Sequence, residues 1–265
     1  ATQAGIAIEN AKFYKESLEK ERLERELQVA ATIQRNILPD HPPEIPGMQI
    51  AATTIPSRFV GGDHYDFHVR SDEYLFSIAD VSGKGIPAAL LVSTLHATQH
   101  ALTEHGEWDL KRIVKGISTS IHRSSLSNKF ITFFLTKYDP ENRSIKTVNA
   151  GHNPPLLVSA DGSMRKLTKG GLVLGMLPDS PYESETTQLK EGDVIVTFTD
   201  GVNEAMNIND EEFGDERFEQ LVINNRGKDA QGIHDAVMNA INEWTAGAPQ
   251  HDDITLVIYK VVGAE

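Results

Sequence analysis

The stretch IADVSGKGIP, residues 78–87, joins a predicted strand to a predicted helix through a glycine-rich turn. The residues just before it, 74–78, alternate apolar and small side chains, which is typical of a strand. Pro87 and the apolar residues after it indicate the first turn of a buried helix. Asp80 therefore stands at a rigid strand end, beside backbone that glycine lets approach closely.

A lone aspartate at a strand end is usually a turn former. Three further acidic motifs, however, stand beside apolar runs that resemble strands: GGD (61–63), TDG (199–201) and HDD (251–253). We therefore predict that these distant acids converge with Asp80 on one site.

Composition limits the class of protein. The 265 residues are 39% hydrophobic and 24% charged, as in ordinary globular proteins. The formal net charge of −13 argues against nucleic acid as the main partner, because phosphate backbones attract basic surfaces. No apolar run approaches the ~20 residues that span a bilayer, and no signal peptide is present. The absence of cysteine excludes disulfides and thiolate metal sites and fits a cytoplasmic protein.

The first 38 residues are predicted to form one long helix, because they are rich in Glu, Lys, Leu and Ala. Leu23, Leu27, Ala30, Gln34 and Ile37 follow a heptad-like 4-3-4-3 spacing. Two interpretations stay open: an amphipathic helix packed on its own domain, or a parallel coiled coil that makes a homodimer. In the second, a polar Gln34 fixes the register, and Gln34→Leu would strengthen association and alter basal activity. Since the sequence starts without a methionine, we expect a fragment of a longer protein.

A proline-rich boundary, PDHPPEIPG (39–47), separates this helix from a domain predicted over 39–265. The predicted strands are 49–55, 64–69, 73–79, 130–138, 144–149, 182–189, 194–199 and 254–261, with a further hairpin around 160–162. The predicted helices are 87–104, 109–124, 215–223 and 231–244. The glycines of 170–175 indicate mobility or close backbone contact. Repeated hairpins with helices between them favour an α+β fold with antiparallel sheet.

Carboxylates at the ends of separate strands can together bind metal ions. Mg²⁺ and Mn²⁺ prefer oxygen ligands, mainly carboxylates, carbonyls and waters. Clustered acids without a cation are unfavourable, because like charges raise one another's pKa. A site with two ions about 3.5–4 Å apart activates a water for in-line attack on phosphorus.

Taken in order, the motifs GGDHYDF (61–67), ADVSGKG (79–85), TDG (199–201) and DDIT (252–255) resemble the metal-dependent serine/threonine phosphatases of the PPM, or protein phosphatase 2C-like, class. QRNILP (34–39) and NAGHNPP (149–155) extend the resemblance to the bacterial SpoIIE/RsbU branch, from about residue 25 to the C-terminus. The resemblance implies two stacked antiparallel sheets flanked by helices, an αββα sandwich behind the long helix. The opening ATQAGIAIENAKFYKE (1–16) is similar to the last helix of a GAF sensor domain.

By this resemblance Asp80 bridges two Mg²⁺ or Mn²⁺ ions, and the Val81 carbonyl is a backbone ligand. Asp63 would bind one ion, and Asp200 and Asp252 the other. Two neighbouring acids are predicted to be structural instead. Strand alternation sends Asp66 away from Asp63, and Asp253 away from Asp252.

The implied enzyme is a protein-serine/threonine phosphatase in which a metal-bridging hydroxide attacks phosphoserine or phosphothreonine directly, with no phosphoenzyme. Eukaryotic relatives carry a histidine two residues after the bridging aspartate, where this chain has Ser82. A metal-bound water is one candidate proton donor to the leaving group. His152 and His251 are others, although a structural role is the simpler interpretation of each histidine. Lys84 either attracts phosphate or is a solvated loop lysine.

Two function classes remain. In this branch the substrate is usually a phosphorylated anti-sigma factor antagonist, so the resemblance implies a bacterial signalling enzyme with a protein substrate. The alternative is a catalytically weak phosphatase fold that only docks a regulator. Loss of a ligand aspartate would favour that module, but all four are present.

Overall fold

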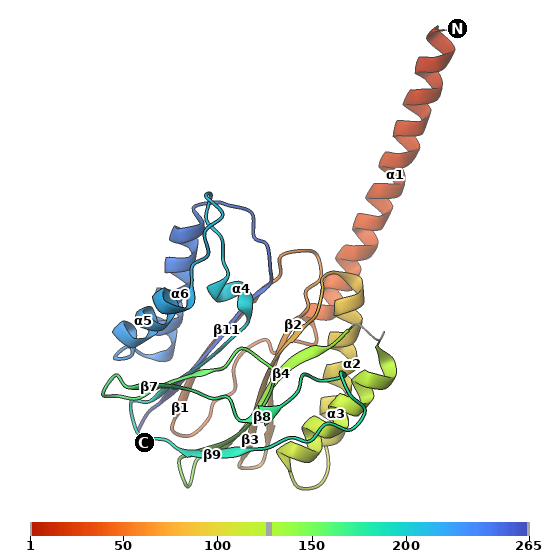
Figure 1. Cartoon of the computed structure of the whole chain (residues 1–265). Coiled ribbons are helices and arrows are strands. Elements are labelled where there is room, and N and C mark those ends of the chain that lie inside the picture. Colours follow the sequence, from red (N-terminus) through yellow and green to blue (C-terminus); the bar gives the residue numbers. More distant parts are fainter. Residues whose placement is uncertain (1, 126–128, 264–265) are drawn as a thin grey trace.

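The computed structural model describes residues 2–125 and 129–263, so Ala1 of the predicted helix lies outside them. Helix α1 (Thr2–Arg35) projects from the body of the molecule (Figure 1). It ends three residues before the predicted Leu38, in a tight turn where the amide of Leu38 donates to the Arg35 carbonyl at 3.2 Å. The cause is Pro39, which disfavours helical backbone in the residue before it.

Two sheets form the centre of the fold. The first has the order β1-β11-β10-β6-β7, and the second β2-β3-β4-β5-β8, with β9 also paired to β5. The first sheet comprises β1 (Met48–Ile55), β6 (Leu156–Val158), β7 (Met164–Lys166), β10 (Val194–Phe198) and β11 (Ile254–Val261). The second comprises β2 (Asp63–Arg70), β3 (Glu73–Val81), β4 (Ile131–Asp139), β5 (Ser144–Ala150), β8 (Gly170–Gly171) and β9 (Glu185–Gln188). The three predicted hairpins are confirmed, and among the named strands of the described residues all pairings except β5–β8 are antiparallel.

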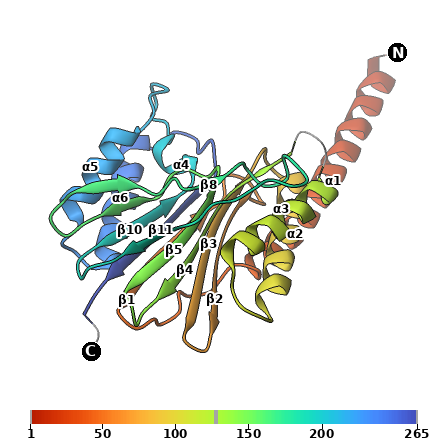
Figure 2. The same cartoon turned by 60° about the horizontal axis from the view of Figure 1, so that its bottom comes forward.

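Helices cover both outer faces of the sheets (Figure 2). Helices α2 (Ile86–Thr103) and α3 (Leu110–Ser124) pack on the second sheet through one apolar cluster. Helices α4 (Asp200–Asn203), α5 (Asp215–Asn225) and α6 (Ala230–Thr245) pack on the first sheet through another. A third cluster, which includes Tyr65, Phe76 and Tyr259, fills the space between the sheets. The predicted αββα sandwich is confirmed.

Strand β2 shows how this layering separates side chains by alternation. Tyr65 belongs to the cluster between the sheets, with Phe67 packed against it. The intervening His64, Asp66 and His68 point to the opposite face, where Asp66 contacts His96 and His100 of helix α2. Neighbouring residues of β2 therefore alternate between the apolar cluster that separates the sheets and the polar contacts with helix α2.

Of the two interpretations of the glycine loop 170–175, the structure shows close backbone contact at its first residue, Gly170. A Cβ at Gly170 would lie 1.7 Å from the Asn149 carbonyl oxygen, so only glycine lets β8 pair with β5 there. The predicted strand 182–189 is shorter, as β9, and the short helix α4 was not predicted. In the part of the chain that the structure describes, no helix is long and apolar enough to cross a membrane.

Candidate functional site

Asp63 and Asp80 face each other across the paired strands β2 and β3, at the ends nearest the glycine-rich turn. Asp63 is buried, and its Oδ2 accepts hydrogen bonds from the hydroxyls of Thr199 at 2.7 Å and Thr255 at 2.6 Å. Thr255 lies on β11 and Thr199 directly follows β10, and both strands belong to the first sheet. The side chain of Asp63, on β2 of the second sheet, therefore links the two sheets. Burial raises the pKa of Asp63 well above its usual range, and the negative charge of Asp80 adds to this shift.

The pKa of Asp80 responds to the charges of three other acids. Burial raises its pKa to about 7, and the charges of Asp200, Asp252 and Asp253 contribute in that order, opposed by Lys84. Burial and then Asp252 likewise raise the pKa of Asp200. The acids predicted from four separated motifs therefore act on one another through space, which is the convergence that the sequence predicted.

The two C-terminal acids are positioned by short local structures. Asp200 is the first residue of α4, immediately after Thr199. The following Gly201 lies against the chain of the last motif, since a Cβ there would be 2.0 Å from the Asp253 carbonyl oxygen. Glycine at this position thus allows the TDG and DDIT segments to meet.

Lys84 of the glycine-rich turn lies beside the last acidic motif. Its ammonium lies 2.8 Å from Asp252 Oδ2 and also donates to the His251 carbonyl. The lysine of the glycine-rich turn thereby connects the end of β3 to the segment before β11 and offsets part of the acidic charge.

Asp253 has a structural role, as predicted. Its Oδ1 accepts from the amide of Ser57 at 2.6 Å and from the Ser57 hydroxyl at 2.9 Å. Its Oδ2 accepts from the amide of Gly62 at 2.6 Å. These bonds fix the loop that leads into Asp63. Asp66 lies on the opposite face of β2, so its predicted separation from the site is also confirmed.

The candidate proton donors differ in their surroundings. His152 is buried, and its Nδ1 lies 2.8 Å from the hydroxyl of Thr132, the residue paired with Asp80 on β4. Burial lowers the pKa of His152 to about 4, so the ring is neutral at pH 7 and has no excess proton to donate. His251 is an exposed loop residue. The Ser82 hydroxyl accepts from the amide of Phe130 at 3.0 Å and holds the turn.

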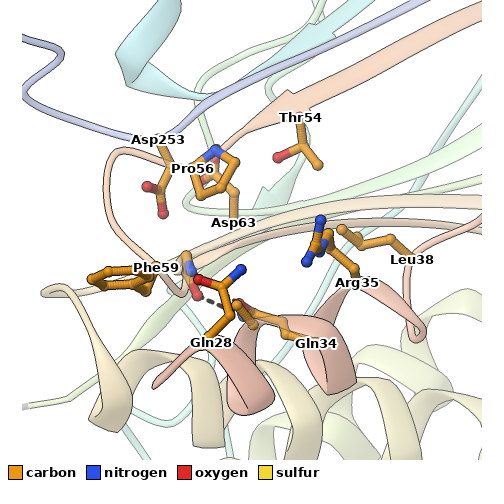
Figure 3. Close-up of a pocket in the computed structure, with 11 residues that line it drawn as sticks. Gln28, Gln34, Arg35, Leu38, Thr54, Pro56, Phe59, Asp63 and Asp253 are labelled. Carbon is orange, nitrogen blue, oxygen red and sulfur yellow. Dashed lines mark hydrogen bonds between the residues drawn. The ribbon is translucent and has the colours of Figure 1, made fainter. Parts of the chain in front are cut away.

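Sequence reasoning missed a contact between α1 and the site. Gln34 Nε2 donates to the Gly61 carbonyl at 2.7 Å, and the Gly61 amide donates to Gln34 Oε1 at 2.9 Å. A cavity of about 300 Å³ lies here, lined by the end of α1 on one side and by Asp63 and Asp253 on the other (Figure 3). The sequence contained an indication of this contact, because Gln34 and Gly61 both belong to motifs that carry the family resemblance.

This contact corrects the role predicted for Gln34. The seam interpretation placed its amide between two chains, whereas the structure pairs both amide groups with its own domain. Leu27, Ala30 and Ile37 are likewise partly buried, although Leu23 is exposed. The second half of the seam thus packs on its own domain, in accord with the other interpretation.

The arrangement of strands, helices and acids defines a phosphatase domain of the protein phosphatase 2C type. The chain belongs to the SpoIIE family: the family model described as "Stage II sporulation protein E (SpoIIE)" matches residues 70–262. Phosphoserine phosphatase RsbU of Bacillus subtilis (strain 168) is 28% identical over 245 residues, which cover 91% of this chain and 71% of RsbU. The chain is a SpoIIE/RsbU-type protein-serine/threonine phosphatase, as its motifs predicted.

Solved structures show the same fold. The SiaA-PP2C domain of Pseudomonas aeruginosa superposes with a TM-score of 0.78 at 24% identity, covering 91% of this chain and 98% of that domain. RsbX, solved in complex with magnesium, superposes with a TM-score of 0.63 at 17% identity, covering 83% of this chain and 98% of RsbX. Identity at this level shows a common fold.

Proposed function

We propose that this domain hydrolyses phosphoserine or phosphothreonine on a bacterial regulatory protein, with two Mg²⁺ or Mn²⁺ ions. The observation that carries the proposal is the meeting of Asp63, Asp80, Asp200 and Asp252 from four separated motifs, where burial and mutual repulsion raise the pKa of the first three. Buried, repelling carboxylates are stabilised by bound cations. The family membership supports the same activity.

The donor set fits hard divalent ions. Side chains that meet here offer carboxylate oxygens, and the Val81 carbonyl, beside Gly62, adds a backbone oxygen. Asp80 would hold both ions, Asp63 with the Val81 carbonyl would hold one of them, and Asp200 with Asp252 would hold the other. When bound, such ions activate a water for attack on phosphorus and stabilise charge on the phosphoryl oxygens.

The protein's own side chains hold this arrangement in place. Thr199 and Thr255 fix the carboxylate of Asp63, and Lys84 fixes that of Asp252. The neutral His152 orients Thr132 beside β3 and does not supply the proton for the leaving serine or threonine oxygen. We propose that this proton comes from a water of the site, which removes the need for a histidine at Ser82.

We propose a phosphorylated anti-sigma factor antagonist as substrate, and therefore a cytoplasmic location. The test is release of inorganic phosphate from candidate phosphoproteins of the source genome, compared with a phosphotyrosine peptide. Turnover of one phosphoserine protein and none of the phosphotyrosine peptide is the expected result. Stable binding of the phosphoprotein without phosphate release by the metal-loaded domain would favour the docking module instead.

For regulation, we propose that residues 1–38 form a helical connection from an upstream sensor to a phosphatase domain over 39–265. Ile6, Phe13, Tyr14 and Leu18 are large exposed apolar residues in the projecting half of α1. We propose that this half pairs with a second copy in a homodimer. The Gln34–Gly61 bonds would then carry changes in helix packing to the loop that precedes Asp63.

The structure changes the expected effect of Gln34→Leu. The substitution removes both amide bonds and leaves the Gly61 amide and carbonyl without these partners, which costs about 1–3 kcal/mol of unfolding free energy. We expect phosphatase activity to fall with the stability, because the loop before Asp63 loses its support. Denaturant unfolding and phosphate release on the same preparation measure the two effects.

The matched control is Gln28→Leu, the same change at an exposed residue of α1 that lines the same cavity but is not hydrogen-bonded to Gly61. It should leave both quantities near wild type. Equal behaviour of the two variants, or wild-type activity of Gln34→Leu, would show that the Gln34–Gly61 contact does not support the active site.

A further inference from the structure

A second cluster of metal-ligating side chains lies on the other face of β2. His64, Asp66 and His68 share this face because they are two residues apart on a strand. His96 and His100 oppose them from α2, four residues apart on one side of a helix. Four imidazoles and one carboxylate thus meet between the second sheet and its covering helix, away from the acids between the sheets.

The side chains are close enough to share one ion, and in this structure His100 Nε2 and Asp66 Oδ2 are hydrogen-bonded to each other. Asp66 Oδ2 lies 2.9 Å from His100 Nε2, 3.2 Å from His68 Nε2 and 3.5 Å from His96 Nδ1. Ligand atoms of a tetrahedral ion with bonds of about 2.0–2.1 Å are about 3.3 Å apart. Two groups of three side chains, each with potential ligand atoms within 4.8 Å of one another, share Asp66: one with His68 and His100, the other with His64 and His96.

Buried nitrogen atoms without hydrogen bonds point to a missing ligand. His64 is fully buried, and neither of its ring nitrogens has a hydrogen-bond partner among the described residues. His68 Nε2 and His96 Nδ1 are also buried without a hydrogen bond of proper geometry in the described chain. Unpaired buried polar atoms cost free energy, which a bound cation would offset.

The surroundings orient these ligands and leave them accessible. Thr103 Oγ1 lies 3.3 Å from His68 Nδ1, and the Phe67 amide donates to Asp66 Oδ1 at 2.8 Å. Such outer contacts fix which ligand atom faces a metal. An open groove along β2 and α2 is lined by His68 and His100, so an ion can reach them from solvent.

We propose that Asp66, His68 and His100 bind one divalent transition-metal ion of the Zn²⁺ class. His64 and His96 lie near the same Asp66 carboxylate and form the more buried side of the site. Imidazole donors select such ions over Mg²⁺, which prefers oxygen. One ion is expected, because a second would have only the shared carboxylate to offset its charge. Bound there, the ion would join α2 to β2 near the C-terminal ends of both elements.

The experiment titrates Zn²⁺ into the metal-free chain by calorimetry, in an Asp80→Asn background that disables the acidic site. One equivalent should bind, and the thermal midpoint should rise by on the order of 5 °C. Co²⁺ should give the visible absorption of a nitrogen- and oxygen-ligated ion. His100→Gln, at a half-exposed side chain, should weaken Zn²⁺ binding at least about 10-fold. His68→Gln with His100→Gln should abolish it.

The exposed His105 is the matched control, and His105→Gln should bind like the parent. Circular dichroism in EDTA checks that each variant folds. Undiminished Zn²⁺ binding in the double variant, or no binding by the parent, would overturn the proposal. Because the Asp80 background is used throughout, either result leaves the proposed phosphatase chemistry untouched.

Discussion

Replacing Asp80 by asparagine should lower phosphatase turnover by at least about 100-fold while the chain stays folded. The variant keeps the size of the side chain but removes the charge that we assign to both metal ions. Asp80 is paired with Asp63 and lies in the field of Asp200 and Asp252, so the substitution removes a charge that all three neighbouring carboxylates face. Phosphate release from a phosphoserine protein at saturating Mn²⁺ measures the effect.

The same substitution should stabilise the metal-free protein. The pKa of Asp80 is about 7 in the folded chain and has an ordinary value of 3.8. Between these pH values the folded state keeps a proton that the unfolded state has lost, so the metal-free stability falls as pH rises from about 4 to 7. At pH 8 the asparagine variant avoids this loss. We expect its thermal midpoint in EDTA to exceed wild type by more than about 2 °C.

Asp72→Asn, in the exposed β2–β3 turn, is the matched control for removing one negative charge. It should change neither turnover nor the thermal midpoint appreciably. Near-normal hydrolysis by the Asp80 variant would place the active site elsewhere on the molecule.

Removal of divalent metal should abolish activity. The side chains proposed as ligands are all carboxylates, and without cations they repel one another in a buried site. Dialysis against EDTA should therefore reduce phosphate release to background, and Mg²⁺ or Mn²⁺ should restore it. The thermal midpoint should fall on chelation and recover with the ions, because binding to the folded state alone adds stability.

EDTA already saturated with Mg²⁺ is the control for direct effects of the chelator. Full turnover in metal-free buffer would exclude the two-metal proposal. Restoration by Zn²⁺ alone, with no response to Mg²⁺ or Mn²⁺, would contradict the oxygen-ligand assignment.

The sequence predicted most of the architecture because its signals are local. Alternating strands around short turns predict hairpins, and Pro39 marks the end of α1 to within a few residues. Its errors are at element ends, where tertiary packing decides: β9 is short, and α4 was missed between a strand and a loop. The ordered acidic motifs identified the family and proposed the ligands, since each acid stands in a recognisable stretch.

Tertiary structure decided what each polar side chain contacts. Alternation along β2 predicted that Asp63 and Asp66 lie on opposite faces of the strand. It did not predict that Asp63 is hydrogen-bonded to two threonines of the first sheet and its adjoining loop, or that Asp66 contacts histidines of helix α2. Gln34 fitted a heptad as well as an intramolecular contact, and only the folded chain paired it with Gly61. The reason is physical: spacing along one element determines which face a side chain occupies, whereas its partners depend on elements that are distant in sequence.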